Sequence, residues 1–195
     1  SLHTTGSVQD LYPWLERDGL ADGYSAAALA PQAGGYLGEL PNGVTSSHMM
    51  FANIKLLADN GLAMPETLDD LIAMVDVLAP KGIQVIAMDN MDSWVMQSCL
   101  FSLVVGRYGA ADWYDRLAAG EIKFTDDWFV KSLEVIDQLY DTGVLSRASL
   151  NSPYGNCRGE FAAGKAAFLI DGDWAAAAFM EDITTGKALL SRDQQ

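Results

Sequence analysis

Apolar positions along the chain change from irregular to periodic after the first 44 residues. Met50, Ile54 and Leu57 recur at three- and four-residue spacing, which is the period of one face of an α-helix. Ser46 and Ser47 stand just before them, and serine side chains commonly cap helix N-termini. The pattern therefore predicts a first helix that begins close to these serines.

A second helix, a strand and a third helix follow in quick succession. Thr67 can cap a helix whose apolar stripe runs over residues 68–78. Residues 83–88 are mostly β-branched or apolar and lie between breaker residues, which predicts a short buried strand. A polar loop at 89–93 then leads into a long apolar helix over 94–108. Ligands of open α/β sheets bind beyond the carboxyl ends of strands, so this loop is the first candidate site.

The last third of the chain shows the same order of helix, strand and helix. A short helix passes through Phe161, a strand spans 166–170, and the turn at 171–173 leads into an alanine-rich helix that begins at Trp174. The sequence contains no internal repeat and no low-complexity linker. The body from about Thr45 onward is therefore predicted to be one α/β unit.

Composition and charge narrow the range of partners. Half of the 195 residues are hydrophobic and 19% are charged, which indicates a globular body rather than a disordered chain. The formal net charge is −14, and no cluster of Lys or Arg offers a surface to phosphate groups. We therefore expect no binding to nucleic acid and no direct membrane insertion. An acidic surface of this kind fits a protein that stays soluble and, at full length, monomeric, and it fits an ordinary acidic protein equally well.

Short-range features argue against a membrane span and a metal site. The longest apolar stretch, 99–105, is far shorter than the roughly 18–20 residues that cross a bilayer. Residues 1–10 contain no basic segment followed by an apolar run, so we expect no signal peptide in this sequence. Cys99 and Cys157 lack the close spacing of a metal motif, and their apolar surroundings favour two buried thiols over a disulfide.

An enzyme should show a nucleophile, a base or metal ligands at workable spacing, and none stands out here. His3 lies near the terminus, and His48 has no carboxylate or cysteine four residues further on. The acidic pairs at 69–70 and 126–127 lie at predicted helix starts, where capping explains them. No glycine-rich phosphate loop is present. We expect no catalytic residue, no metal and no cofactor.

Aromatic side chains beside acids are the strongest chemical signal. Sugars present an apolar face and a ring of hydroxyls, so their sites combine aromatic rings with carboxylate and amide groups. Trp94 follows Asp92, and Trp174 follows Asp173, in both cases after a predicted strand. Tyr154 stands in a Ser-Pro-Tyr-Gly loop, where its ring could contact a ligand. Each ring could instead anchor or cover the core, and the sequence leaves both interpretations open.

Four segments of the sequence together carry a family resemblance. They are GELPNG at 38–43 with MFAN at 50–53 and LL at 56–57; GL at 61–62 with PETLDDL at 65–71; KGI at 81–83 with DSW at 92–94; and FAAGKAAF at 161–168 with GDW at 172–174. In this order and at this spacing they resemble the family 1 extracellular solute-binding proteins, the maltose-binding-like group of ABC importers.

The resemblance implies two α/β lobes joined by a hinge, with a sugar or another polar solute held in the cleft between them. Closure around the solute would signal to the ABC transporter permease, at the periplasmic side of the membrane or at the cell surface. Residues 1–44 would be the end of the N-terminal lobe and the hinge. Residues 45–195 would be an incomplete C-terminal lobe of the periplasmic-binding-protein-like II type, with helices packed on a small mixed sheet. Complete members are about twice as long, so the chain looks like a fragment.

Carried over residue by residue, the resemblance names candidate ligand-binding residues. Trp174 resembles the stacking aromatic of the second lobe, and Asp173 beside it is placed to accept hydrogen bonds from sugar hydroxyls. Asp92 and Trp94 match the loop after the first strand of that lobe. Five further candidates lie at the hinge edge and in a later loop: Thr45, Ser46, Ser47, Asn42 and Tyr154.

Two other functions remain open beside the capture of a mono- or oligosaccharide for import. A carbohydrate-active enzyme, or its accessory module, would need two carboxylates that face each other across a cleft. A lobe fragment that acts only by docking to its missing half would need no site of its own. Sugar capture without bond breakage is the leading hypothesis.

Overall fold

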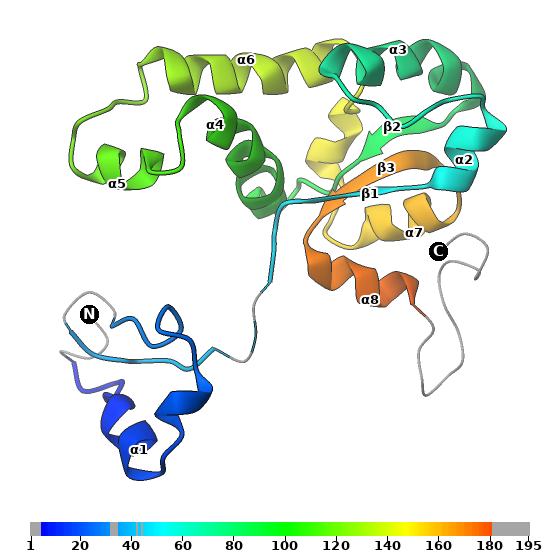
Figure 1. Ribbon diagram of the computed structural model, residues 1–195. Coiled ribbons are helices and arrows are strands. Elements are labelled where there is room, and N and C mark those ends of the chain that lie inside the picture. Colours follow the sequence, from blue (N-terminus) through cyan, green and yellow to red (C-terminus); the bar gives the residue numbers. More distant parts are fainter. Residues whose placement is uncertain (1–4, 32–34, 42, 44, 181–195) are drawn as a thin grey trace. The chain divides into compact units, whose positions relative to one another are not determined.

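The computed structural model describes residues 5–31, 35–41, 43 and 45–180. The chain forms two compact units, one over Ser1–Val44 and one over Thr45–Gln195 (Figure 1).

The N-terminal unit contains helix α1 (Tyr12–Arg17) and the 3₁₀ turn η1 (Ala21–Gly23). The residues just before α1 are joined to a later segment of the unit through the backbone of Leu37. The Leu11 N–H donates to the Leu37 carbonyl oxygen at 2.8 Å, and the Leu37 N–H donates to Oδ1 of Asp10 at 3.0 Å. Among the described residues of this unit, the buried hydrophobic ones are Leu15, Tyr36 and Leu37.

The second unit alternates helices and strands, as the sequence predicts. In chain order its elements are β1 (Met49–Ala52), α2 (Ile54–Asp59), α3 (Leu68–Leu78), η2 (Ala79–Lys81), β2 (Gln84–Ala87), η3 (Met96–Phe101), α4 (Ser102–Tyr108), α5 (Trp113–Ala118), α6 (Asp127–Asp141), η4 (Arg147–Asn151), α7 (Asn156–Ala162), β3 (Ala166–Asp171), η5 (Asp173–Ala175) and α8 (Ala176–Phe179).

The sheet has three strands in the order β1-β3-β2. β2 runs parallel to β3, with Ala87 opposite Leu169, and β1 runs antiparallel to β3, with Met49 opposite Asp171. The central strand β3 is buried along its whole length. The predicted fold class, an α/β unit with helices on a small mixed sheet, is confirmed.

Helices cover both faces of the sheet (Figure 1). On one face α2, α3, the helix after β2 and α6 pack against inward-pointing side chains such as Phe168 and Ile170. On the other face α7 and α8 pack against Ala87 and Leu169. The alternation of Phe168, Leu169 and Ile170 between the two faces follows from the two-residue period of a strand. The helices on both faces thus hold the strand ends in place.

Helix α3 begins as its sequence predicts. The Thr67 side chain accepts a hydrogen bond from the Asp70 N–H at 3.1 Å, and Oδ2 of Asp70 accepts one from the Thr67 N–H at 2.9 Å. This reciprocal pair is a capping box, which satisfies two backbone donors that the first helical turn leaves unpaired. Hydrogen bonds to the Asp70 carboxylate, from the Thr67 side chain and from the N–H groups of Glu66 and Thr67, favour its charged form and hold the pKa of Asp70 below its usual value.

The first predicted helix begins later than the sequence suggests. Residues 49–52 form strand β1, and the capping residue of α2 is Asn53, whose Oδ1 accepts from the Leu56 N–H at 3.0 Å. Ser46 and Ser47 therefore do not cap a helix, and His48 precedes a strand. Pairing of β1 with β3 outweighs the helical spacing of Met50, because a whole edge of β3 would otherwise lack backbone partners.

The long helix after β2 is confirmed, but its first part is wider than an α-helix. Residues 96–101 form the π-helical segment η3, and α4 continues from it without a break. Ser102 lies at the junction, where its hydroxyl donates to the Ser98 carbonyl oxygen at 2.6 Å and contacts His48 Nε2 at 2.6 Å. Cys99, Leu100 and Val105 point into the core from this helix.

No helix in the described part of the chain is long and apolar enough to cross a membrane. The two cysteines are free and buried, as expected. Burial raises the pKa of Cys99 to about 11 and that of Cys157 to about 12, and the nearby carboxylates of Asp171 and Asp89 add to these shifts.

Both thiols should resist a thiol reagent until the protein unfolds, because only the thiolate reacts. At pH 8 we expect labelling by a disulfide reagent to be roughly a hundred to a thousand times slower in the folded chain than in concentrated urea. Equally fast labelling of folded and unfolded chain would contradict the burial of these residues.

The same burial makes stability depend on pH. Since folding raises both pKa values above the unfolded value of about 8.5, the free energy of unfolding should fall as pH rises past that value.

Candidate functional site

The parallel pairing of β2 and β3 brings two tryptophans together. Trp94 follows the carboxyl end of β2 and Trp174 follows that of β3, so both lie at one edge of the sheet. Their ring centroids are 5.9 Å apart, with the ring planes tilted by 43°. Each ring is half-buried, and each packs against the core cluster of a different face of the sheet. The two rings are thus neighbours at the surface, each anchored by its own core.

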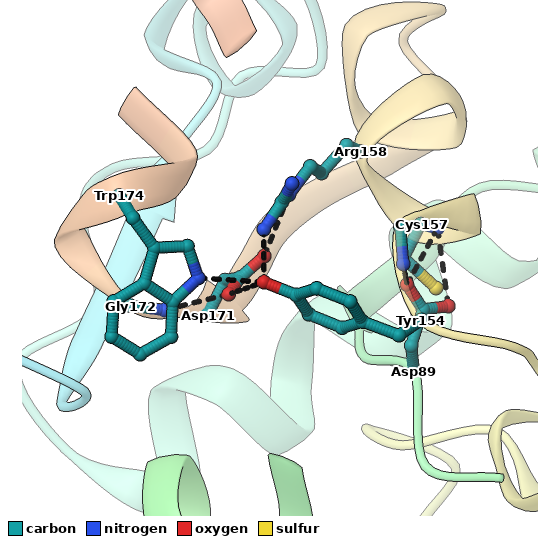
Figure 2. A network of polar contacts seen from close by, with 8 residues as sticks. Asp89, Tyr154, Cys157, Arg158, Asp171, Gly172 and Trp174 are labelled. Carbon is teal, nitrogen blue, oxygen red and sulfur yellow. Dashed lines mark hydrogen bonds and ion pairs between the residues drawn. The ribbon is translucent and has the colours of Figure 1, made fainter. Parts of the chain in front are cut away.

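Tyr154 completes a cluster of three rings. Its ring lies 4.7 Å from that of Trp94 in an edge-on arrangement. Its hydroxyl accepts a hydrogen bond from the Trp174 indole Nε1–H at 2.6 Å. Figure 2 shows the tyrosine reaching across from the α7 side so that its hydroxyl meets the indole of Trp174. We refer to Trp94, Tyr154 and Trp174 as the aromatic cluster.

The loop that carries Tyr154 is held by a buried acid. Asp89 comes two residues after β2 and is 6% exposed. Its carboxylate accepts from the Gly155 N–H at 2.8 Å, from the Cys157 N–H at 3.1 Å and from the Ser152 hydroxyl at 2.6 Å. These bonds satisfy backbone donors at the start of α7 and fix both sides of Tyr154.

A second buried acid lies behind the aromatic cluster. Asp171, the last residue of β3, forms an ion pair with Arg158 of α7, with 2.9 Å between Nε and Oδ2. The Asp171 side chain is 5% exposed and that of Arg158 is 19% exposed. Oδ1 of Asp171 also accepts from the Tyr154 hydroxyl at 3.2 Å and from the Gly172 N–H at 2.7 Å. Figure 2 shows Trp174, Arg158 and Asp171 meeting at the Tyr154 hydroxyl, with the contacts between Asp89 and Cys157 lying apart from them.

Both titratable partners of Asp171 keep their protons. Burial disfavours the charge of Arg158, but the hydrogen bond and the charge of Asp171 outweigh it, so the pKa of Arg158 is raised. Burial is also the largest influence on Tyr154 and raises its pKa, and the charge of Asp171 adds to this effect. The phenol therefore remains a hydrogen-bond donor at neutral pH.

The Trp174 indole packs directly against the backbone of Gly172. A Cβ atom on this residue would overlap the six-membered ring of Trp174. Its backbone angles, φ −89° and ψ 169°, are open to any residue, so the requirement for glycine is purely one of space. The motif Gly172-Asp173-Trp174 therefore folds the indole back over its own backbone.

The predicted polar site residues differ in their contacts. Asp173 and Ser46 are tied together, since the Ser46 N–H donates to Asp173 Oδ2 at 2.9 Å and the Asp173 N–H donates to the Ser46 carbonyl oxygen at 2.8 Å. This pairing places Thr45 and Ser47 on either side of the contact with Asp173. Asp92 is exposed in the loop after β2, where its carbonyl oxygen accepts from the Trp94 N–H at 2.8 Å.

Asn42, another predicted candidate, lies outside the described residues. Within the described part of the chain, no three His, Cys, Asp or Glu side chains come together as possible metal ligands.

Sequence reasoning missed the residues that hold the aromatic cluster. Asp171 was visible as the first acid of an Asp-Gly-Asp turn, and Asp89 as the first polar residue after a predicted strand. An acid at the carboxyl end of a buried strand needs partners, and that signal could have singled out both. Nothing in the sequence around Arg158 marks it, because its partner Asp171 is brought near only by the packing of α7 on β3.

Comparisons with known proteins match this chain to one family. The sequence profile of the family described as bacterial extracellular solute-binding protein matches residues 5–190. Among curated protein sequences, none matches the chain significantly.

Solved structures also share the fold of this chain. A chitin oligosaccharide binding protein superposes with a TM-score of 0.79 at 23% identity, covering 92% of this chain and 45% of its own. A structure from work on xylan utilization by the thermophilic bacterium Caldanaerobius polysaccharolyticus gives 0.80 at 21% identity, with 92% and 46% covered. A probable secreted solute-binding lipoprotein from Streptomyces coelicolor gives 0.66 at 22%, with 95% and 47% covered. The chain thus spans about half the length of the structures it matches.

Adding one methyl group at residue 172 should displace the indole of Trp174. We expect Gly172→Ala to change the near-ultraviolet circular dichroism of the tryptophans and to lower the free energy of unfolding by about 1–3 kcal/mol, as overpacking does.

Gly159→Ala is the matched control, because a Cβ there meets no atom within 4 Å and residue 159 lies within α7. It should leave the spectrum unchanged and stabilise the chain by roughly 0.5–1 kcal/mol. If Gly172→Ala behaved like this control, the indole would not rest on the glycine backbone.

Proposed function

This chain belongs to the bacterial extracellular solute-binding protein family, and we propose that it is part of the sugar-capturing receptor of an ABC importer. The family consists of binding proteins rather than enzymes, which speaks against the carbohydrate-active enzyme considered from the sequence. The proposed activity is reversible binding of a mono- or oligosaccharide, with no bond broken.

The observation that carries this proposal is the aromatic cluster at the carboxyl ends of β2 and β3. Ring centroids 4.7 Å and 5.9 Å from that of Trp94 bring three aromatic side chains to one half-buried surface. The C–H face of a pyranose packs well on such rings, because it is apolar and flat. An anionic solute would find no comparable support in a chain of net charge −14.

Acids beside the aromatic cluster would complete the recognition. In our proposal, Asp173 and Asp92 accept hydrogen bonds from sugar hydroxyls. Oδ2 of Asp173 already binds the Ser46 N–H, whereas Oδ1 has no partner among the described residues. Thr45, Ser46 and Ser47 would add short polar side chains next to Asp173, and Asn42 would extend this edge.

The solutes of similar structures support a sugar or a related polyol. They include a chitin oligosaccharide binding protein, an ABC transporter solute-binding protein in complex with ribitol, and the solute-binding protein RafE in complex with raffinose. The RafE complex is 25% identical to this chain with a TM-score of 0.51, and the match covers 66% of this chain and 35% of RafE. These solutes share several hydroxyls and no net charge, which agrees with rings flanked by carboxylates.

Import and location extend the proposal. We infer that the sugar is delivered to the permease of an ABC transporter, outside the cytoplasmic membrane, in the periplasm or at the cell surface. In this arrangement residues 1–44 belong to the end of one lobe and the hinge, and residues 45–195 belong to the other lobe. The remaining half of the cleft would come from the part of the family fold that this chain does not span.

Titration of the 195-residue chain with a panel of sugars tests the proposal. The panel contains chito-oligosaccharides, xylan-derived oligosaccharides, raffinose and ribitol. We expect at least one sugar to quench tryptophan fluorescence with a dissociation constant of about 1 mM, which is weak because the chain spans only about half of the matched fold. Trp174→Ala should weaken this binding at least about tenfold through loss of the stacking face.

Trp14→Ala is the matched control, because Trp14 is half exposed and belongs to the N-terminal unit, where it contacts Arg17. It should leave the affinity unchanged. Two results would count against the proposal: no response to any sugar of the panel, or equal affinity for the wild-type chain and Trp174→Ala.

A further inference from the structure

We propose that Arg158 and Asp171 are positioning residues that hold Tyr154 and Trp174 in place before any sugar arrives. A bound sugar would then meet only the ring faces of these two residues, and not the phenol hydroxyl or the indole N–H. This inference rests on the proposed function, because it assigns roles within the same site.

The hydroxyl of Tyr154 has no capacity left for a ligand. A tyrosine hydroxyl can donate one hydrogen bond and accept two. In this structure it donates to Asp171 Oδ1 at 3.2 Å and accepts from the Trp174 Nε1–H at 2.6 Å. The Arg158 Nη2–H donates the second bond that it accepts.

The indole N–H of Trp174 is used up in the same way. An indole has one N–H and no acceptor, and that N–H points at the Tyr154 hydroxyl. Gly172 lies against the six-membered part of the same ring, so the indole is held by a hydrogen bond on one side and by backbone contact on another. Neither polar atom can turn toward a sugar without breaking an internal bond.

Asp171 and Arg158 make the arrangement rigid. The Asp171 carboxylate accepts three bonds, from Tyr154, from the Gly172 N–H and from Arg158 Nε, and its side chain is nearly inaccessible to solvent. The Arg158 guanidinium also lies over the Tyr154 ring, 4.7 Å from its centroid. A buried carboxylate that loses its charged partner is strongly destabilised, so the pair resists any movement that would separate it.

The network joins three elements of secondary structure. Asp171 ends β3, Arg158 lies in α7, and Trp174 lies in η5. Asp89 pins the start of α7 from the end of β2. The aromatic cluster is therefore fixed from both strands whose ends it covers, which lowers the ordering cost of binding.

This division of roles determines specificity. Tyr154 and Trp174 pack against the apolar face of the sugar and respond to its shape. Asp173 and Asp92 accept hydrogen bonds and so respond to the arrangement of its hydroxyls. The rings then accept different sugars of similar face, and the acids distinguish among them.

The test compares the indole N–H resonances of ligand-free chains by NMR. The chain has five tryptophans, and Trp174→Phe identifies the signal of Trp174 by its loss. In Tyr154→Phe the indole loses its acceptor, so we expect its signal to shift and its exchange with water to accelerate roughly fivefold to tenfold. Arg158→Gln should shift the same signal, because Tyr154 loses the bond from Nη2 and Asp171 loses its ion-pair partner.

Arg147→Gln is the matched control. Arg147 forms an ion pair with Asp141 at 2.7 Å and lies over the Tyr140 ring at 5.8 Å, but both charged side chains are more than half exposed. This variant should leave the Trp174 signal unchanged. Tyr154→Phe removes one oxygen atom and leaves both members of the ion pair in the chain, so we expect it to fold and to decide the question even if Arg158→Gln does not.

An unchanged Trp174 signal in folded Tyr154→Phe would overturn the proposal. If raffinose, or another sugar of the panel, also bound this variant more weakly while the signal stayed the same, the hydroxyl would contact the sugar directly. The ligand-free measurement needs no sugar. A chain that bound none of them would contradict the proposed function and leave the spectroscopic result intact.

Discussion

The parallel pairing of β2 with β3 is the constraint on which the site depends. Parallel strands end at the same edge of a sheet, so whatever follows each strand is delivered to the same place. Here the residues delivered are Trp94 after β2 and Trp174 after β3. The antiparallel strand β1 enters from the opposite direction, and the segment that precedes it is tied to Asp173 through Ser46.

Two buried acids convert this shared edge into a rigid surface. Asp89 and Asp171 stand at or just beyond the carboxyl ends of β2 and β3, and each is almost fully buried. A buried carboxylate is tolerated only where hydrogen bonds or a cation replace its water shell. Asp89 finds backbone N–H groups at the start of α7, and Asp171 finds Arg158 and Tyr154. These two carboxylates need hydrogen-bond partners because they are buried. The partners that they find also hold the aromatic cluster in place.

Much of this architecture could be predicted from the sequence, and the reasons for the failures are specific. The N-cap at Thr67, the buried strand predicted over 83–88 and the helix from Trp94 depend on local patterns, and the structure confirms them, with the strand at Gln84–Ala87. Strand β1 was missed because its four residues also fit a helical spacing and are fixed as a strand only by contact with β3. The family was predicted from four short motifs and is confirmed by its sequence profile. The sequence placed Trp94 and Trp174 after two predicted strands, but the parallel pairing that brings these rings together, and the position of Tyr154 between them, came only from the structure. The role of Arg158 required the packing of α7, which no local pattern encodes.

The π-helical segment Met96–Phe101 has a consequence for comparing this chain with its relatives. A widened turn takes in one more residue than an α-helical turn while the helix beyond it keeps its direction and facing. Trp94 can therefore point to the sheet edge while Val104 and Val105 still face the core. A homologue with a regular helix at this place would carry one residue fewer, so an alignment that joins the tryptophan motif to the following valines needs a gap inside the helix.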